Sequence, residues 1–449
     1  MDILSIFLVV TFMIVITWVI SQQFGVWSVG TFCGVMFTLG FGVRSFVVNT
    51  ESDYKIFGLF TPEPIDLLLL DWVGLAGLIA FTAGMFLTPK HWRRDRAPLP
   101  TYDHIDRLRY SRKWGFYLIA TFAALGIQMT GLALISGGVQ HAIQIFAQRT
   151  IANFSSVGFI GAICVEMWSL TIPFALISLV CAFRSKVYTY SAISGLVLVL
   201  LMVWAATING RAAAIIIPWA AIICVNEMTS SRIRGYWLLL GLPGAAVVAV
   251  VGLAFRVAAQ QHIPFDVALG TASGKAIYNT SDSLPMLDAA WIGLEYVRIQ
   301  GHNVFNTVVA PFTVLVPRAF WAEKPIFAPQ LFSEAVTHAP TGGGLPAGVV
   351  GEGYVAFGWA GMLLFCGLMG AAAAAFDREI IKRRAGELLA AWLVFEATVA
   401  VLMGIRVGFQ GLLITCQLAL IWLPLLWGTQ SYIGHLLSPK YQRARRWRA

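Results

Sequence analysis

The chain has 449 residues, of which 58% are apolar and only 12% are charged, and its mean hydropathy is +0.76. Soluble domains carry about a quarter charged residues, so this composition excludes a soluble fold and indicates a polytopic membrane protein. The net charge of +9 follows from membrane orientation and from attraction to anionic lipid. We therefore expect membrane lipids, and no nucleic acid, as partners.

Eleven apolar stretches are long enough to cross a bilayer as helices, which takes roughly 17–25 residues. The first, Ile3–Ile20, follows Asp2 instead of a basic segment and precedes no small-residue cleavage site, so we interpret it as a retained helix. The shorter run Val308–Val316 predicts a re-entrant or interfacial segment. The predicted spans are 3–20, 27–47, 68–88, 115–136, 158–183, 190–207, 212–228, 236–255, 347–375, 388–404 and 410–427.

Basic residues gather in every second connection between these spans, and the clusters contain 21 of the 31 lysines and arginines. The positive-inside rule assigns these connections to the cytoplasm, so the amino terminus and the long polar segment face outward. We expect a bundle of about eight spans over 1–255, a large periplasmic loop subdomain over 256–346, and three further spans with a basic cytoplasmic tail over 347–449. The clusters lie at 90–113, 184–186, 232–234, 378–384 and 440–448.

The six cysteines all fall inside predicted spans, so the outer loop carries neither a disulfide framework nor a Cys/His metal pattern. We expect no metal and no other cofactor. A transporter built from inverted repeats would show matching broken segments in its two halves, and the sequence shows no obvious pair of this kind.

Ten basic residues lie on the outward side, where orientation does not require them. We interpret Arg44, Lys55 and Lys275 as side chains that extend along the apolar surface to the membrane interface. Arg211 and Arg406 instead occupy tight turns between two apolar helices, in INGRAAAIII and MGIRVGFQGLL. A guanidinium held there could bind phosphate oxygens through its fork of donors. The alternative is a structural pair with an acid such as Glu166 or Glu396.

The segment Val-Pro-Arg-Ala-Phe-Trp-Ala-Glu-Lys-Pro holds Arg318 and Lys324 between two prolines. The prolines restrict the backbone, and the aromatic pair favours the membrane interface. Two cations preorganised at this spacing suit a pyrophosphate. An interfacial loop alone would explain the aromatic residues but not the cation spacing.

Glu352 stands between two glycines where the ninth span begins, and His338 lies in a Gly/Pro-rich stretch shortly before it. Either side chain could act as a general base or orient a sugar hydroxyl, and we take Glu352 as the first candidate and His338 as the second. The flanking glycines would let a sugar approach the backbone closely. The competing interpretation of Glu352 is a carboxylate that stabilises a helix amino terminus.

The order of these features resembles the O-antigen polymerase family, the Wzy-type polymerases of oligosaccharide repeat units. Ala322 and Ala356 depart from the family pattern, but neither removes a charged candidate. The residues that carry the resemblance are Asn209-Gly210-Arg211, then Pro317-Arg318 with Trp321 and Lys324-Pro325, then Glu352-Gly353-Tyr354 with Phe357-Gly358-Trp359.

The resemblance implies an all-helical, GT-C-like membrane bundle that acts at the periplasmic face of the bacterial inner membrane. Donor and acceptor would both be undecaprenyl-pyrophosphate-linked glycans, and a chain-length regulator would be a further partner. Arg211, Arg318, Lys324 and Arg406 would stabilise the charge that develops on the pyrophosphate without a metal ion. The alternatives are an O-antigen ligase, which uses the same donor, and a flippase or transporter for lipid-linked sugar.

Overall fold

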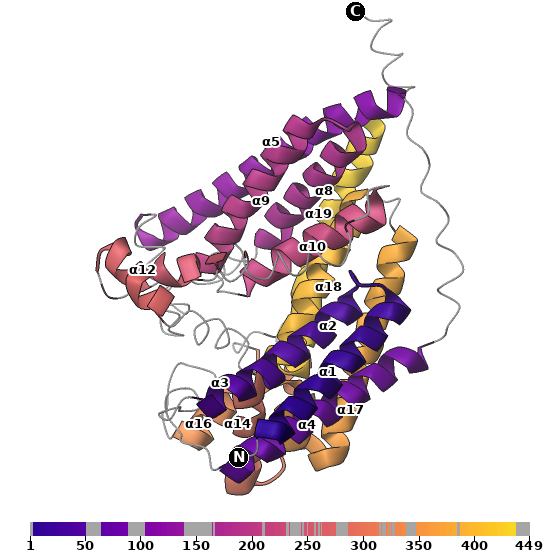
Figure 1. The fold of residues 1–449 in the computed structure, drawn as a ribbon. Coiled ribbons are helices and arrows are strands. Elements are labelled where there is room, and N and C mark those ends of the chain that lie inside the picture. The colour runs from indigo at the N-terminus through magenta and orange to yellow at the C-terminus, as the bar shows by residue number, and fades with distance from the viewer. Residues whose placement is uncertain are drawn as a thin grey trace, which may run out of the picture.

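In the computed structural model, all regular secondary structure of the described residues is helical, and no strand occurs among them. The order of the helices is given in Figure 1. The described residues are 3–50, 64–88, 104–138, 167–208, 212–229, 250–255, 263–274, 286–313, 328–337, 347–383 and 387–436, with scattered further positions between these ranges.

Long apolar helices precede and follow a run of shorter helices between residues 263 and 337. The amino-terminal half contains α1 (Ile3–Phe24), α2 (Val29–Phe37), the π-helix η1 (Thr38–Val43), α3 (Arg44–Thr50), α4 (Pro64–Leu87), α5 (His104–Ser136), α8 (Trp168–Ser185), α9 (Tyr188–Ile208) and α10 (Ala213–Met228). The remainder contains α12 (Phe265–Gly274), α14 (Met286–Gln300), α15 (Val304–Val308), the 3-10 helix η2 (Ala310–Thr313), α16 (Ala328–Thr337), α17 (Gly348–Arg383), α18 (Glu387–Val407) and α19 (Phe409–Leu436).

The chain is an all-helical, multi-pass membrane protein. Within the described ranges, nine helical segments are long and apolar enough to cross a bilayer, and each coincides with a predicted span. The predicted span 212–228 corresponds to α10, an apolar helix of 16 residues that is shorter than a full crossing. The predicted span 236–255 lies mostly outside the described residues.

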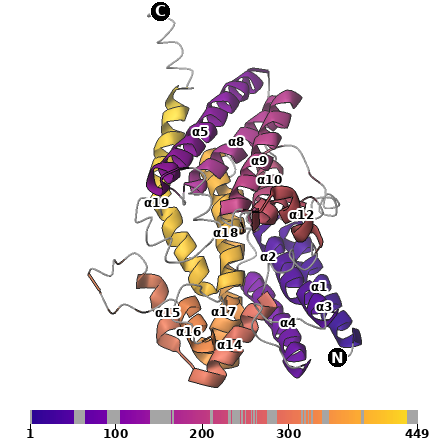
Figure 2. The same ribbon diagram turned by 90° about the vertical axis from the view of Figure 1, so that its left-hand side faces the viewer.

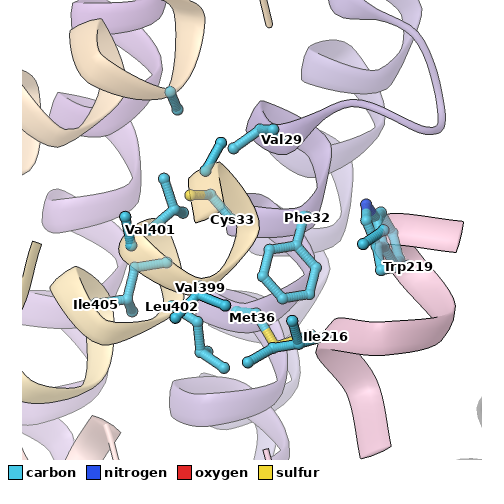
Figure 3. Close-up of a cluster of buried hydrophobic side chains, with 14 of the residues drawn as sticks. Val29, Phe32, Cys33, Met36, Ile216, Trp219, Val399, Val401, Leu402 and Ile405 are labelled. Atoms are coloured by element: carbon cyan, nitrogen blue, oxygen red, sulfur yellow. The ribbon is translucent and has the colours of Figure 1, made fainter. Parts of the chain in front are cut away.

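The centre of the bundle is a close-packed apolar core in which α2 lies between α10 and α18 (Figure 3). Phe32 of α2 contacts Trp219 of α10, with ring centroids 5.2 Å apart. Elsewhere α4 and α17 pack backbone to backbone, because a Cβ placed on Gly84 would overlap the carbonyl of Gly367. Small residues allow this close approach. The resulting van der Waals contacts drive helix association within a membrane, where lipid is as apolar as the side chains and the hydrophobic effect contributes little.

The two ends of the bundle differ in character. At the end that we call the loop end, α14, α15 and α16 gather beside the starts of α17 and α19 (Figure 2). The opposite end, which we call the basic end, carries Arg184 at the close of α8 and Arg378 and Lys382 near the close of α17.

At the basic end, α17 also caps a neighbouring helix. The carboxylate of Asp377 accepts the backbone N–H groups of Val29 and Gly30, at 2.7 and 3.1 Å. These are the first two residues of α2, whose N–H groups have no partner inside the helix. A carboxylate here satisfies them and complements the helix dipole.

Arg44 is fully buried, so our interpretation of it as an interfacial side chain was wrong. Its Nε and Nη2 atoms donate to the two carboxylate oxygens of Asp288 on α14, at 3.2 and 2.9 Å. The two side chains are 1% and 0% exposed. The π-helix η1 immediately precedes Arg44 and shifts the helical register by one residue, which changes the direction in which the guanidinium leaves the helix. The ion pair fastens α14 to the membrane bundle.

Candidate functional site

A break in α17 shapes the loop end. Phe357 has φ −141° and ψ 25°, and Gly358 has φ 63° and ψ −146°, so the helix stops and restarts at these residues. A break frees backbone carbonyls that must find new partners, above all within a membrane. The carbonyl of Tyr354 accepts from Nδ1 of His302 at 3.2 Å, and that of Val355 accepts from the N–H of Asn303 at 2.9 Å. The turn between α14 and α15 therefore completes the break.

The glycines around Glu352 are occupied by helix contacts. A Cβ placed on Gly353 would lie 2.6 Å from the carbonyl oxygen of Gly361, beyond the break, so the two parts of α17 cross there. A Cβ on Gly351 would lie 3.0 Å from the carbonyl oxygen of Ala289 on α14. The interpretation that these glycines leave room for a sugar was therefore wrong, because protein backbone already fills the space.

Glu352 is 1% exposed, and its carboxylate faces the amino terminus of α19. Its two oxygens accept the backbone N–H of Gln410 at 3.3 and 3.4 Å, and the carboxylate also accepts the backbone N–H of Phe409. Glu352 therefore caps the amino terminus of α19, and not that of α17, the helix that carries it. Gly408, at φ 130°, makes the approach possible, since a Cβ there would overlap the carboxylate.

Gln410 extends the network to the short helix α15 at the loop end. Its Nε2 donates to the carbonyls of Asn306 and Thr307, at 2.7 and 3.2 Å, which satisfies the end of the short helix α15. The start of α15 is held by Asn303, whose Oδ1 accepts the N–H of Asn306 at 3.1 Å. Gln410 therefore connects the buried carboxylate of Glu352 to α15.

The backbone of Arg406 lies near the start of α17, the helix that carries Glu352. Arg406 belongs to the last turn of α18, is half-buried, and its carbonyl lies near Gly348 at the start of α17. The alternative partner Glu396 stands ten residues earlier on the same helix, about 15 Å along its axis, so the two do not pair directly. Arg406 and Glu352 thus share the junction of α17, α18 and α19.

The other four candidate residues, Arg211, Arg318, Lys324 and His338, lie outside the described residues, as does the alternative partner Glu166. Within the described ranges, no three His, Cys, Asp or Glu side chains come together as a metal ion would require. None of His302, Asn303 and Gln410 was predicted from the sequence to be a site residue. Gln410 could have been found from the sequence, because it is a polar residue shortly after a glycine in an otherwise apolar stretch.

No protein family, curated protein or solved structure matched this chain in the comparisons made.

Proposed function

We propose that this protein is a GT-C-like glycosyltransferase of the bacterial inner membrane that polymerises undecaprenyl-pyrophosphate-linked repeat units into O-antigen or a related surface polysaccharide. The observation that carries the proposal is that Glu352 on α17 and the backbone of Arg406 on α18 lie at one helix junction of the loop end. This end lies opposite the ends of α8 and α17, where two basic clusters of the sequence begin, and the positive-inside rule therefore supports a periplasmic orientation for it. The sequence motifs described above supply the remaining support.

In this proposal, the growing glycan leaves its lipid pyrophosphate and joins the incoming repeat unit. The bond between the sugar and the pyrophosphate breaks, and negative charge develops on the phosphate oxygens. Arg406, together with Arg211, Arg318 and Lys324, stabilises that charge through charge-assisted hydrogen bonds. Arginine suits this task because its planar fork donates to two phosphate oxygens at once.

The acceptor hydroxyl must lose its proton to a base. Glu352 is the first candidate, but in the described conformation its carboxylate is occupied by the amino terminus of α19. For the carboxylate to reach a sugar hydroxyl, the bonds between Gln410 and α15 must open. The same opening would uncover the junction to substrate, so Gln410 is a positioning residue in this scheme. His338 is the second candidate for the base.

The test is to incubate purified protein in lipid bilayers with a lipid-linked repeat unit and to separate the products on a gel. The proposal expects a ladder whose steps differ by one repeat unit. A ligase would give no ladder and would transfer glycan only when a lipid A core or protein acceptor is added. A flippase would move the labelled lipid across the bilayer without lengthening it. Either of these results would overturn the proposal.

A further inference from the structure

The short helix α15 and the turn η2 that follows it carry apolar side chains on the outside and a polar one on the inside. Four apolar side chains are exposed, at 40%, 59%, 36% and 63% for Val304, Phe305, Val308 and Phe312. The side chain of Thr307, on the same helix, is fully buried. A helix at a water-facing surface shows the reverse polarity. The inversion indicates that hydrocarbon surrounds this segment.

The backbone of the same segment finds its hydrogen-bond partners inside the protein. Gln410 donates to the carbonyls of Asn306 and Thr307, at 2.7 and 3.2 Å, where α15 ends. The hydroxyl of Thr307 donates to the carbonyl of Asn303 at 2.8 Å, where α15 begins. Helix ends and turns at membrane depth are tolerated only when protein groups satisfy their backbone in this way. The segment therefore meets the requirement that lipid places on it.

The depth of α15 follows from its two neighbours at the loop end, α17 and α19 (Figure 2). Its end bonds to Gln410, the second residue of the membrane span α19. Its start lies at the break in α17, and the part of α17 beyond Gly358, about 37 Å long, is enough to cross the hydrocarbon by itself. Phe357 and Trp359 beside the break are 48% and 47% exposed, as is common at a membrane interface. Thus α15 lies at the boundary of the hydrocarbon.

The end of α14 marks the polar side of this boundary. Arg298 in its last turn is 78% exposed and pairs with Glu295 of the same helix, and Gln300 is exposed as well. From Val304 onward the exposed side chains of α15 and η2 are apolar. The chain therefore passes from a polar surface to an apolar one within a few residues.

We propose that α15 and η2 form an interfacial anchor, whose exposed apolar side chains insert among the lipid acyl chains of the leaflet at the loop end. The partner is the apolar part of the bilayer, and no particular head group is required. The long loop is tied to the membrane at this point. The anchor is held from outside by lipid and from inside by Gln410, which connects it to Glu352. The inference is independent of the proposed polymerase activity.

The first test measures the surroundings of the anchor in lipid vesicles. A nitroxide spin label is placed on Phe305→Cys or Phe312→Cys, and its collisions with oxygen, which dissolves in hydrocarbon, are compared with those of a water-soluble nickel chelate. Both labels should favour oxygen, as should Ile119→Cys on an exposed apolar position of the span α5, whereas Arg298→Cys should favour nickel. Labels at 305 and 312 that behave like the label at 298 would overturn the proposal. The unsubstituted protein, whose six cysteines are free, gives the background.

The second test uses a substitution whose effect has opposite signs in lipid and in water. Phe305 lies in the first turn of α15, where an aspartate in water would stabilise the helix through its dipole. At the edge of the hydrocarbon the same charge is costly, so Phe305→Asp should lower the unfolding temperature in vesicles by several degrees. Gln300→Asp, at the exposed end of α14, is the control and should change it little. An unchanged or raised unfolding temperature for Phe305→Asp would contradict membrane insertion, and the spin labels decide the matter if this variant does not fold.

Discussion

Arg44 and Asp288 form a two-point ion pair that is closed to solvent, although 244 residues separate them in the chain. Arg44 belongs to the second membrane span and Asp288 to α14, so the pair holds α14 against α3. Charges buried this deeply are retained only with good geometry and matched partners. The position of α14, and with it the turn that completes the α17 break, therefore depends on this pair.

Removing one partner of this pair should be far more damaging than removing both. Asp288→Ala leaves a buried guanidinium without its counter-charge and should lower the free energy of unfolding by about 3–5 kcal/mol. The double variant Arg44→Met with Asp288→Leu replaces the pair by apolar groups and should recover most of that loss. Thermal unfolding in detergent measures both. Equal destabilisation by the single and the double variant would contradict this account.

Glu352→Gln should separate capping from catalysis. The amide oxygen can still accept the N–H of Gln410, so the free energy of unfolding should fall by no more than about 1 kcal/mol. The amide cannot act as a base, so the polymerisation rate should fall on the order of 10²-fold while lipid-linked donor still binds. Gel-based rates and unfolding temperatures on the same sample give both quantities. Near-normal polymer would reassign the role of base to His338.

Arg318→Ala should abolish the ladder without reducing expression, and Arg318→Lys should rescue little, because lysine cannot make the two-point contact. Arg298→Ala is the control, since that side chain is exposed and pairs with Glu295 in its own helix. The underlying hypothesis is that Arg211, Arg318, Lys324 and Arg406 converge on one pyrophosphate. A donor-bound structure with these groups more than roughly 20 Å apart would defeat it.

Transfer should not depend on a metal ion. The hypothesis rests on the absence from the outer-loop sequence of carboxylates or histidines with metal-ligand spacing. Polymerisation should proceed at the same rate in EDTA as in buffer with added magnesium or manganese. If EDTA stops the reaction and either metal restores it, the cationic residues do not act alone on the leaving group.

Gly358→Ala should destabilise the loop end. At φ 63° and ψ −146° a side chain is strained, so we expect a cost of about 1–3 kcal/mol. Gly195→Ala is a matched control inside α9, where a Cβ meets nothing within 4 Å and alanine is the better helix former. The control should be neutral or stabilising. A loss of the same size at both positions would indicate that the break has no special role.

Much of the fold followed from the sequence, because apolar length alone reports membrane spans. Nine predicted spans coincide with long helices, including the one that begins beside Glu352. The break at Gly358 escaped prediction, since its neighbours are as apolar as those of an unbroken helix. Contacts between segments that lie far apart in the sequence could not be predicted either. Nothing local to Arg44 reveals Asp288, and nothing local to Glu352 reveals that its carboxylate caps α19.

Two carboxylates of α17, Glu352 and Asp377, set the relative heights of two other helices in the membrane. Glu352 meets the start of α19 and Asp377 meets the start of α2, at opposite ends of the bundle. A slide of α17 along its axis would carry both carboxylates the same way, so it would press one against its amino terminus and withdraw the other. Axial sliding is thus resisted in both directions, whereas a swing of the short part of α17 about Gly358 would move Glu352 and leave the Asp377 contact in place. Motion at the loop end can therefore occur while the rest of α17 keeps its depth.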